Sequence, residues 1–266
     1  MPQPAEQFTK WVRRSHPAPQ ARTRLVCLPH AGGSASFYFP VSRALAPSVE
    51  VLAVQYPGRQ DRRHEPNIPD LHVMADRIFD AVRHLDDKPL ALFGHSMGAV
   101  LAYEVALRMQ DAGLPAPARV FTSGRRAPSC VRDERIHAAT DQQLVAELRK
   151  LSGTDSTMLT DPELLEMIMP AIRSDYRAVE TYAHDPGRKL DCPVTVLTGD
   201  SDPRVTVGEA AAWEHHTSGP TDLHVYPGGH FYLAEPRESV RVIELLRELL
   251  AGQGADAPAR GRAVVA

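Results

Sequence analysis

The feature that most constrains the fold of this chain is a regular alternation of short apolar runs with longer amphipathic segments. Most of the short runs are rich in β-branched residues and continuously apolar, which is typical of strands covered by helices on both faces. The six runs lie at residues 24–29, 49–57, 89–94, 118–124, 193–199 and 222–228. The alternation predicts an α/β domain with a mainly parallel sheet, because parallel neighbours need crossover connections between them.

Amphipathic helix patterns separate many of these runs. The patterns lie at residues 69–85, 97–112, 140–151, 161–183 and 236–250. The stretch from about 125 to 190 holds two of them and no convincing strand. An all-helical insert between two strands of a parallel sheet predicts a lid over the carboxyl ends of the strands, where ligands bind in such sheets.

The second lid helix carries its own start signals and an apolar face. Asp161 is placed as its N-cap and Pro162 at its first helical position, whereas Pro170 is expected to kink it. One face collects the apolar residues Leu165, Ile168, Met169, Ile172, Tyr176 and Val179. This face predicts that the lid packs against the body of the domain.

We expect one α/β domain at residues 24–251, an N-terminal extension at 1–23 and a disordered tail at 252–266. A chain of 266 residues with 43% apolar residues is long enough for one large domain with a sizeable core. The extension lacks the apolar core of a signal peptide, and no later segment is apolar enough to span a bilayer. A soluble, cytoplasmic protein with no membrane partner is therefore expected.

Charge and cysteine content exclude two further classes of function. The formal net charge of -3 gives no basic field of the kind that nucleic-acid binding relies on. Cys27, Cys130 and Cys192 are odd in number and widely spaced, which fits neither a disulfide framework nor paired metal ligands. We therefore expect reduced thiols, no nucleic-acid partner, no metal and no cofactor.

The sequence FGHSMG at residues 93–98 makes Ser96 a candidate nucleophile. The bare pattern of a serine between two glycines is weak evidence, because chance supplies it often. Here it follows a predicted buried strand and leads directly into a helix pattern. A serine on such a sharp turn lies exposed at the top of the sheet, and Gly94 and Gly98 leave room for the close crossing.

A serine hydroxyl needs a base, and His230 is the best-placed histidine. It follows the last predicted strand in a glycine-rich loop, at the edge of the sheet where Ser96 should emerge. His95 is next to the serine, but the turn should direct its side chain away from the hydroxyl. Packed or solvated roles are expected for the histidines of one helix pattern and one strand, His215, His216 and His224.

The base needs an acid to orient it, and the loop after the penultimate strand offers Asp200 and Asp202. Because the carboxyl ends of adjacent parallel strands meet at one edge, this loop should lie beside His230. We favour Asp202, which lies further into the loop. The chain order Ser, Asp, His is the order expected for an α/β-hydrolase.

Two backbone N–H groups are candidates for an oxyanion hole. One is that of Met97, the residue after the nucleophile. The other comes from the segment PHAGGS at 29–34, which follows the first strand and resembles the His-Gly-rich loop of lipases and esterases. Ala31 is our choice for that donor.

The order of these motifs resembles the type II thioesterases that accompany modular polyketide and nonribosomal peptide synthetases. The medium-chain fatty-acid synthase thioesterases are similar. The resemblance covers residues 25 to 233 and rests on the segments LPHAGGSASFY, QYPGRQDRRHEP, FGHSMGAVLAYEVA, GDSDP and YPGGHFYL. It implies an α/β-hydrolase fold with a helical lid, and an enzyme that needs no cofactor.

The resemblance also implies roles and a substrate. It makes Ser96, Asp202 and His230 the catalytic residues, and Ala31 and Met97 the oxyanion donors. It implies hydrolysis of acyl thioesters on the phosphopantetheine arm of acyl or peptidyl carrier proteins, which releases stalled or mis-primed acyl groups. Thioesterase domains fused to synthetases usually take their acid from the strand after the nucleophile helix. Here that strand ends FTSGRRAPS, so the later loop has to supply the acid, as in the stand-alone type.

Other functions stay open on the residues alone. A serine acyltransferase or a general carboxylesterase would use the same groups, and a silent binding module would keep the fold without the chemistry.

Carrier proteins tend to be acidic, so arginines near the mouth of the site are candidates for docking one. The arginines concerned are Arg59, Arg62, Arg63, Arg125, Arg126, Arg132 and Arg135.

Overall fold

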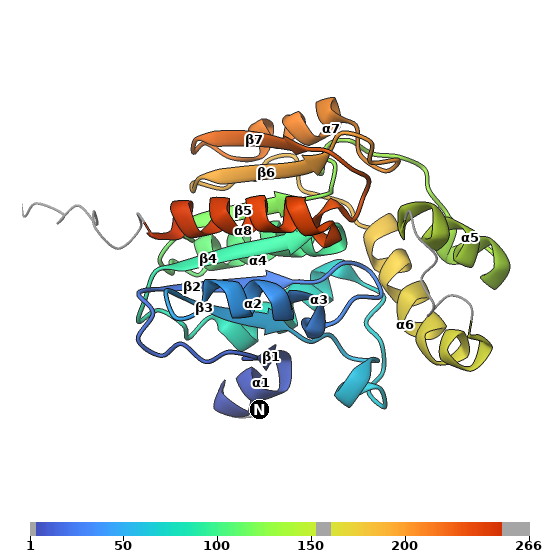
Figure 1. The fold of residues 1–266 in the computed structure, drawn as a ribbon, viewed down its shortest axis with the longest axis horizontal. Helices are drawn as coiled ribbons and strands as arrows, with labels where there is room; N and C mark the ends of the chain where they lie inside the picture. Colours follow the sequence, from blue (N-terminus) through green and yellow to red (C-terminus); the bar gives the residue numbers. More distant parts are fainter. Residues whose placement is uncertain (1–3, 153–160, 252–266) are drawn as a thin grey trace, which may run out of the picture.

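The computed structural model describes residues 4–152 and 161–251, with one seven-stranded sheet at the centre (Figure 1). The strand order is β1-β3-β2-β4-β5-β6-β7, and all neighbours are parallel except β1 and β3. The strands are β1 (Val12–Arg13), β2 (Thr23–Leu28), β3 (Val49–Val54), β4 (Leu90–His95), β5 (Arg119–Ser123), β6 (Val194–Gly199) and β7 (Thr221–Tyr226). The predicted mainly parallel sheet is confirmed. The predicted disordered tail lies outside the described residues.

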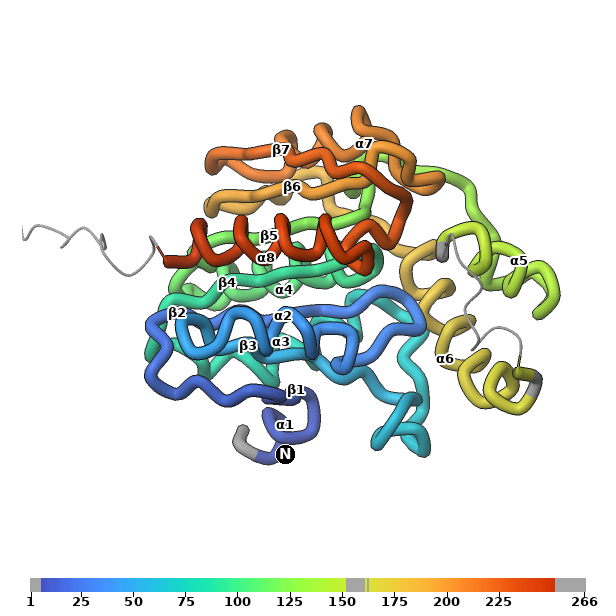
Figure 2. The backbone as a smooth tube through the Cα atoms, in the orientation of Figure 1, coloured from blue at the N-terminus to red at the C-terminus, as the bar shows by residue number. Residues whose placement is uncertain are grey.

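Helices cover both faces of the sheet, which explains why strands β2 to β6 are buried almost throughout, whereas the edge strand β7 is partly exposed. Helices α2 (Phe39–Leu45) and α8 (Pro236–Ala251) lie on the near face in Figures 1 and 2, and α3 (Leu71–Val82) and α4 (Met97–Asp111) pack on the other face. Alternate side chains of β2 serve the two faces. Val26 packs in the core cluster of α3 and α4, and Leu25 packs in the cluster of α2 and α8.

The remaining helices are short or lie at the ends of the domain. They are α1 (Pro4–Trp11), α5 (Asp141–Ser152), α6 (Pro162–Glu180), α7 (Val207–Ala211) and the 3-10 turns Ala35–Tyr38, Gln60–Arg62, Ile136–Ala138, Ala212–His216 and Tyr232–Ala234.

The helical insert predicted at about residues 125–190 lies between β5 and β6 and contains α5 and α6, which lie at one end of the sheet (Figure 1). The Asp161 side chain caps α6 by accepting hydrogen bonds from the N–H groups of Glu163 and Leu164. The helix continues through Pro170 to Glu180. Its predicted apolar face packs mainly against the other lid helix, α5, in a cluster of Leu144, Met169, Ile172 and Tyr176. Of this face, Val179 belongs to the main core, so the predicted packing on the body holds for only part of it.

The N-terminal segment adds an edge strand that the sequence pattern did not predict. Val12 and Arg13 pair antiparallel with β3, and Trp11 and Val12 are each 5% exposed within the main core. The guanidinium of Arg62 lies 4.3 Å from the centre of the Trp11 ring. A two-residue strand carries no periodicity, so its sequence gives no signal.

We expect Trp11→Ala to lower the free energy of unfolding by about 3 kcal/mol, because it leaves a cavity at the sheet edge and removes the contact with Arg62. Urea unfolding followed by circular dichroism measures the change. The matched control is Val131→Ala at a side chain that is 82% exposed, where we expect a change within about 0.5 kcal/mol. Equal stabilities of the two variants would show that the N-terminal segment is not part of the cooperative unit.

Candidate active site

Ser96 lies on a strained turn between β4 and α4. Its backbone has φ 56° and ψ −116°, a conformation that residues other than glycine rarely adopt. The Ser96 N–H donates a hydrogen bond to the carbonyl of Ser123 at the end of β5, at 2.8 Å. This contact with the neighbouring strand holds the turn, and the serine is partly exposed above the sheet.

The motif needs glycine at positions 94 and 98 because the backbones of β4, α4 and β2 approach closely at the turn. A Cβ atom on Gly94 would lie 1.9 Å from the carbonyl oxygen of Gly98, and one on Gly98 would lie 2.0 Å from that of Leu28. No side chain fits at either position. The motif therefore lets α4 start directly against β4 and β2, which directs Ser96 out of the sheet.

Asp202 and His230 reach the serine from the loops that follow β6 and β7. His230 Nε2 lies 3.0 Å from Ser96 Oγ, and His230 Nδ1 lies 2.8 Å from Asp202 Oδ2. The side chains of His230 and Asp202 are 4% and 0% exposed. The other Asp202 oxygen accepts the N–H of Arg204 at 2.8 Å, so the carboxylate is fixed from both sides. The three groups form the chain that a nucleophile, a base and an orienting acid require.

The alternatives that the sequence left open lie elsewhere. Asp200 is exposed and accepts hydrogen bonds from Ser201 and Gly228. His95 Nδ1 lies 2.9 Å from Ser123 Oγ, and the latter lies 2.6 Å from the Tyr232 hydroxyl. The other histidines do not join the site either: His216 lies against Ser129, His215 is exposed, and His224 is on β7.

The N–H groups of Ala31 and Met97 are free to bind an oxyanion. Neither donates a hydrogen bond within residues 4–152 and 161–251. Met97 begins α4, whose first N–H groups have no intrahelical acceptor and carry the positive end of the helix dipole. Ala31 follows β2 and lines the same cavity as Ser96.

A cavity of about 50 Å³ lies over the serine, between the sheet edge and the lid helices. Its walls include Tyr176 and Val179 of α6, and Arg125 of the loop after β5. Burial and the nearby charge of Arg126 lower the pKa of Arg125 to about 10. The cavity is small, so only a short part of a substrate fits in it as it stands.

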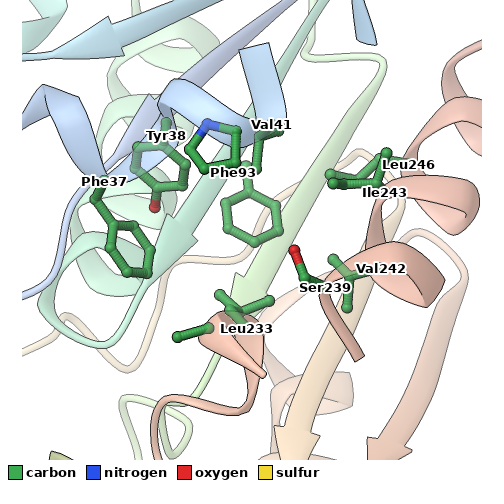
Figure 3. Close-up of a pocket in the computed structure, with 11 residues that line it drawn as sticks. Phe37, Tyr38, Val41, Phe93, Leu233, Ser239, Val242, Ile243 and Leu246 are labelled. Atoms are coloured by element: carbon green, nitrogen blue, oxygen red, sulfur yellow. The ribbon is translucent and has the colours of Figure 1, made fainter. Parts of the chain in front are cut away.

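A larger apolar pocket of about 290 Å³ lies between α2 and α8 (Figure 3). Phe93 of β4 forms its floor, and Leu233 and Val242 are among its walls. Its residues do not include Ser96, His230 or Asp202. Phe37 lines this pocket and packs edge-on against His30, which lines the cavity over the serine, so one aromatic layer separates the two spaces.

The prediction that a cluster of arginines docks an acidic partner is wrong for three of its members. Arg59, Arg62 and Arg126 are 5–8% exposed, and each donates to a carboxylate of this chain. The three carboxylates belong to Asp175, Glu65 and Glu134. Of the others, Arg132 pairs with Glu209 and Arg135 with Asp133, Arg125 lines the cavity, and Arg63 is exposed.

Some residues that support the site gave no clear signal in the sequence. Asp175 of α6 accepts the N–H of Gly32 in the loop at residues 29–34, and Ser123 and Tyr232 connect β5 to the loop of His230. A carboxylate within the apolar face of a helix, next to Ile172 and Tyr176, was the one available hint for Asp175.

No group of three or more His, Cys, Asp or Glu side chains in the described ranges is placed to hold a metal ion. Over the same residues, none of the helices combines the length and the apolar character needed to cross a membrane.

The sheet, the serine turn and the helical insert together define the α/β-hydrolase fold. Comparison with known families matches residues 23–250 to the Thioesterase domain, and the chain therefore belongs to the thioesterase family. Two curated relatives are similar. The "Probable cadicidin biosynthesis thioesterase" of Streptomyces griseus is 53% identical over 87% of this chain and 64% of its own length. Thioesterase PikA5 of Streptomyces venezuelae is 51% identical over 84% of this chain and 80% of its own length.

Comparison with solved structures points to the same family. The type II thioesterase BorB from the borrelidin biosynthetic cluster is 51% identical, with a TM-score of 0.83 over 90% of this chain and 97% of its own. The resemblance found in the sequence motifs is thus confirmed at the level of family and fold.

The imidazole of His30 beside the site makes stability depend on pH. Burial, together with the neighbouring His230 and Arg59, lowers the pKa of His30 from 6.5 to about 3. Between these pH values the unfolded chain binds a proton at His30 that the folded chain does not. The part of the folding stability that is linked to neutral His30 is therefore fully present above about pH 7, and it is lost as the pH falls from about 6.5 towards 3.

We expect His30 to account for a loss on the order of 1 to 2 kcal/mol between about pH 7.5 and pH 5, and His30→Phe to remove that part of the pH dependence. Urea unfolding of both proteins at the two pH values measures it. His215→Gln is the control, because this side chain is exposed and lies outside the site, and we expect the same loss as in wild type. The same slope in wild type and His30→Phe would contradict the assignment.

Proposed function

We propose that this protein is a type II thioesterase that hydrolyses acyl thioesters on the phosphopantetheine arm of carrier proteins. In this role it releases stalled or mis-primed acyl groups from a polyketide or nonribosomal peptide synthetase in the cytoplasm. The observation that carries the proposal is the chain of contacts from Ser96 through His230 to Asp202, with 3.0 Å and 2.8 Å between the heavy atoms. The likeness to biosynthesis thioesterases and to BorB supports the choice of a carrier-bound thioester.

In the first half of the reaction, Ser96 becomes acylated. His230 Nε2 takes the proton of Ser96 Oγ as the oxygen attacks the thioester carbonyl, and Asp202 stabilises the imidazolium. The carbonyl oxygen becomes an oxyanion that accepts the N–H groups of Ala31 and Met97. The tetrahedral intermediate collapses, the carbon–sulfur bond breaks, and the leaving thiolate takes the proton from His230 Nε2, which returns the imidazole to its neutral form.

In the second half, water replaces the thiol. His230 accepts a proton from water as its oxygen attacks the acyl carbon, and the same two N–H groups hold the second oxyanion. The acyl–Ser96 bond breaks, the serine oxygen regains its proton from His230, and the acid is released.

The chemistry of the leaving group favours thioesters at such a site. A thiol with a pKa of about 8.5 leaves far more readily than an amine, so acylation needs little help from a general acid. The side chain of Ser96 faces the cavity of about 50 Å³ between the sheet edge and the lid, which has room for the short reacting part of a thioester.

The proposal is tested by hydrolysis of acyl groups on a carrier protein and on cysteamine, with three single variants. Ser96→Ala should abolish turnover on both substrates, because it removes the attacking oxygen. Asp202→Asn should lower kcat by about 10⁴-fold, because the base loses its orienting carboxylate. The matched control is Asp200→Asn in the same loop, which should stay within about threefold of wild type.

Two outcomes would reject the assignment. Turnover retained in Ser96→Ala would place the nucleophile elsewhere, and equal effects of the two aspartate variants would remove Asp202 from its role. Transfer of the acyl group to an added alcohol or amine, in place of free acid, would make the enzyme an acyltransferase.

A further inference from the structure

We propose that Asp175 of the lid helix α6 is a positioning residue for the oxyanion hole. It holds the loop at 29–34, and with it the Ala31 N–H, against the site of Ser96. The inference rests on the proposed function and goes beyond it, because it gives a part of the lid a role in the chemical step.

The contacts of Asp175 join three segments that are far apart in the sequence. Its Oδ2 accepts the N–H of Gly32 at 2.8 Å and Arg59 Nη1 at 2.6 Å, and its Oδ1 accepts Arg59 Nη2 at 3.0 Å. The Asp175 side chain is 0% exposed and that of Arg59 is 7% exposed. A two-pronged ion pair of this kind fixes orientation as well as distance.

Arg59 completes the clamp on the loop from the other side. Its Nη1 also donates to the carbonyl of Gly33 at 3.1 Å, and its Nε donates to that of Pro57 at 3.1 Å. Burial alone would lower the pKa of Arg59, but the charge and hydrogen bonds of Asp175 outweigh burial and raise it. The loop is thus held through one N–H and one C=O by the buried pair of Asp175 and Arg59.

Packing brings the loop and the helix into close contact. Gly32 has φ +74°, and a Cβ atom there would lie 2.7 Å from Cγ1 of Ile172. Ile172 is three residues before Asp175, so both lie on the face of α6 that meets the loop. Ala31 itself packs against the apolar cluster of the lid helices.

These contacts bear on the chemical step because oxyanion stabilisation depends steeply on geometry. The donors act when they lie about 2.7–3.1 Å from the developing charge, and a misplacement of about 1 Å can cost about 10²-fold in rate. Fixing the Gly32 N–H fixes the peptide that follows Ala31 and so restricts the torsions that aim the Ala31 N–H. In this arrangement α6 cannot move away from the sheet without breaking a buried ion pair.

The test compares Asp175→Asn with Glu50→Gln. The asparagine keeps the size of the side chain, but it leaves Arg59 without a counter-charge. Its NH₂ group is a donor and would face the donors of Arg59 and Gly32. Glu50 makes a comparable buried ion pair, with Glu50 Oε2 2.8 Å from Arg24 Nε. It lies at the start of β3, at the amino ends of the parallel strands, whereas the site lies at their carboxyl ends. Arg59→Lys is the second variant, since it keeps the charge and loses the fork that holds Asp175 and Gly33 together.

We expect Asp175→Asn to lower kcat by about 10- to 100-fold with KM within about threefold, and to weaken binding of a phenylboronic acid by a similar factor. A boronic acid forms a tetrahedral adduct on the serine that needs the oxyanion donors. Arg59→Lys should also lower kcat and weaken the binding of the boronic acid. Glu50→Gln should lower the urea midpoint and leave kcat and boronic acid affinity within about threefold of wild type.

The inference is overturned if Asp175→Asn keeps wild-type kcat, if only KM changes, or if Glu50→Gln lowers kcat equally. If Asp175→Asn does not fold, Arg59→Lys decides by the same criteria. Ser96→Ala is measured in parallel. Activity in that variant would reject the proposed function, whereas an inactive Ser96→Ala with a fully active Asp175→Asn would reject the positioning role alone.

Discussion

The close crossing of β4 and α4 at Ser96 is the constraint on which the rest of the site depends. The backbones approach so closely that Gly94 and Gly98 have no room for a Cβ atom, and the serine between them takes a positive φ. This strain is sustained by the hydrogen bond to β5 and by a helix that is buried along most of its length. Because the turn projects Ser96 from the carboxyl edge of the sheet, the loops after β2, β6 and β7 can meet it there.

The lid both lines the cavity over Ser96 and contacts the loop of Ala31. Its helix α6 supplies Tyr176 and Val179 to the wall of the cavity, and its neighbouring residues Ile172 and Asp175 contact the loop of Ala31. The same helix therefore shapes the space for the acyl group and, under our proposal, holds one of the groups that stabilises the transition state. Differences in the lid between relatives would then alter chemistry as well as selectivity.

Much of the fold and the central groups of the site could be predicted because they depend on local patterns and on the order of strands. Buried strands are continuously apolar, and α4 ends beside Gly113, which has a φ of 64°. The proximity of Asp202 and His230 to Ser96 was predictable because parallel strands have their carboxyl ends at one edge. Arg59 and Asp175 were not, since they are 116 residues apart and only the folded chain shows that a loop arginine is a buried partner of a helix. The two-residue strand β1 was too short to show a period.

The central claim is that Ser96 carries the acyl group between its two transfers. The most direct measurement is an acid quench within milliseconds of mixing the wild-type enzyme with an acyl carrier protein thioester, followed by mass spectrometry of its peptides. We predict that the peptide containing Ser96 gains the mass of the acyl group and that this species disappears as free acid forms. Steady hydrolysis without any acyl adduct, or an adduct on Cys130 in place of Ser96, would contradict the account.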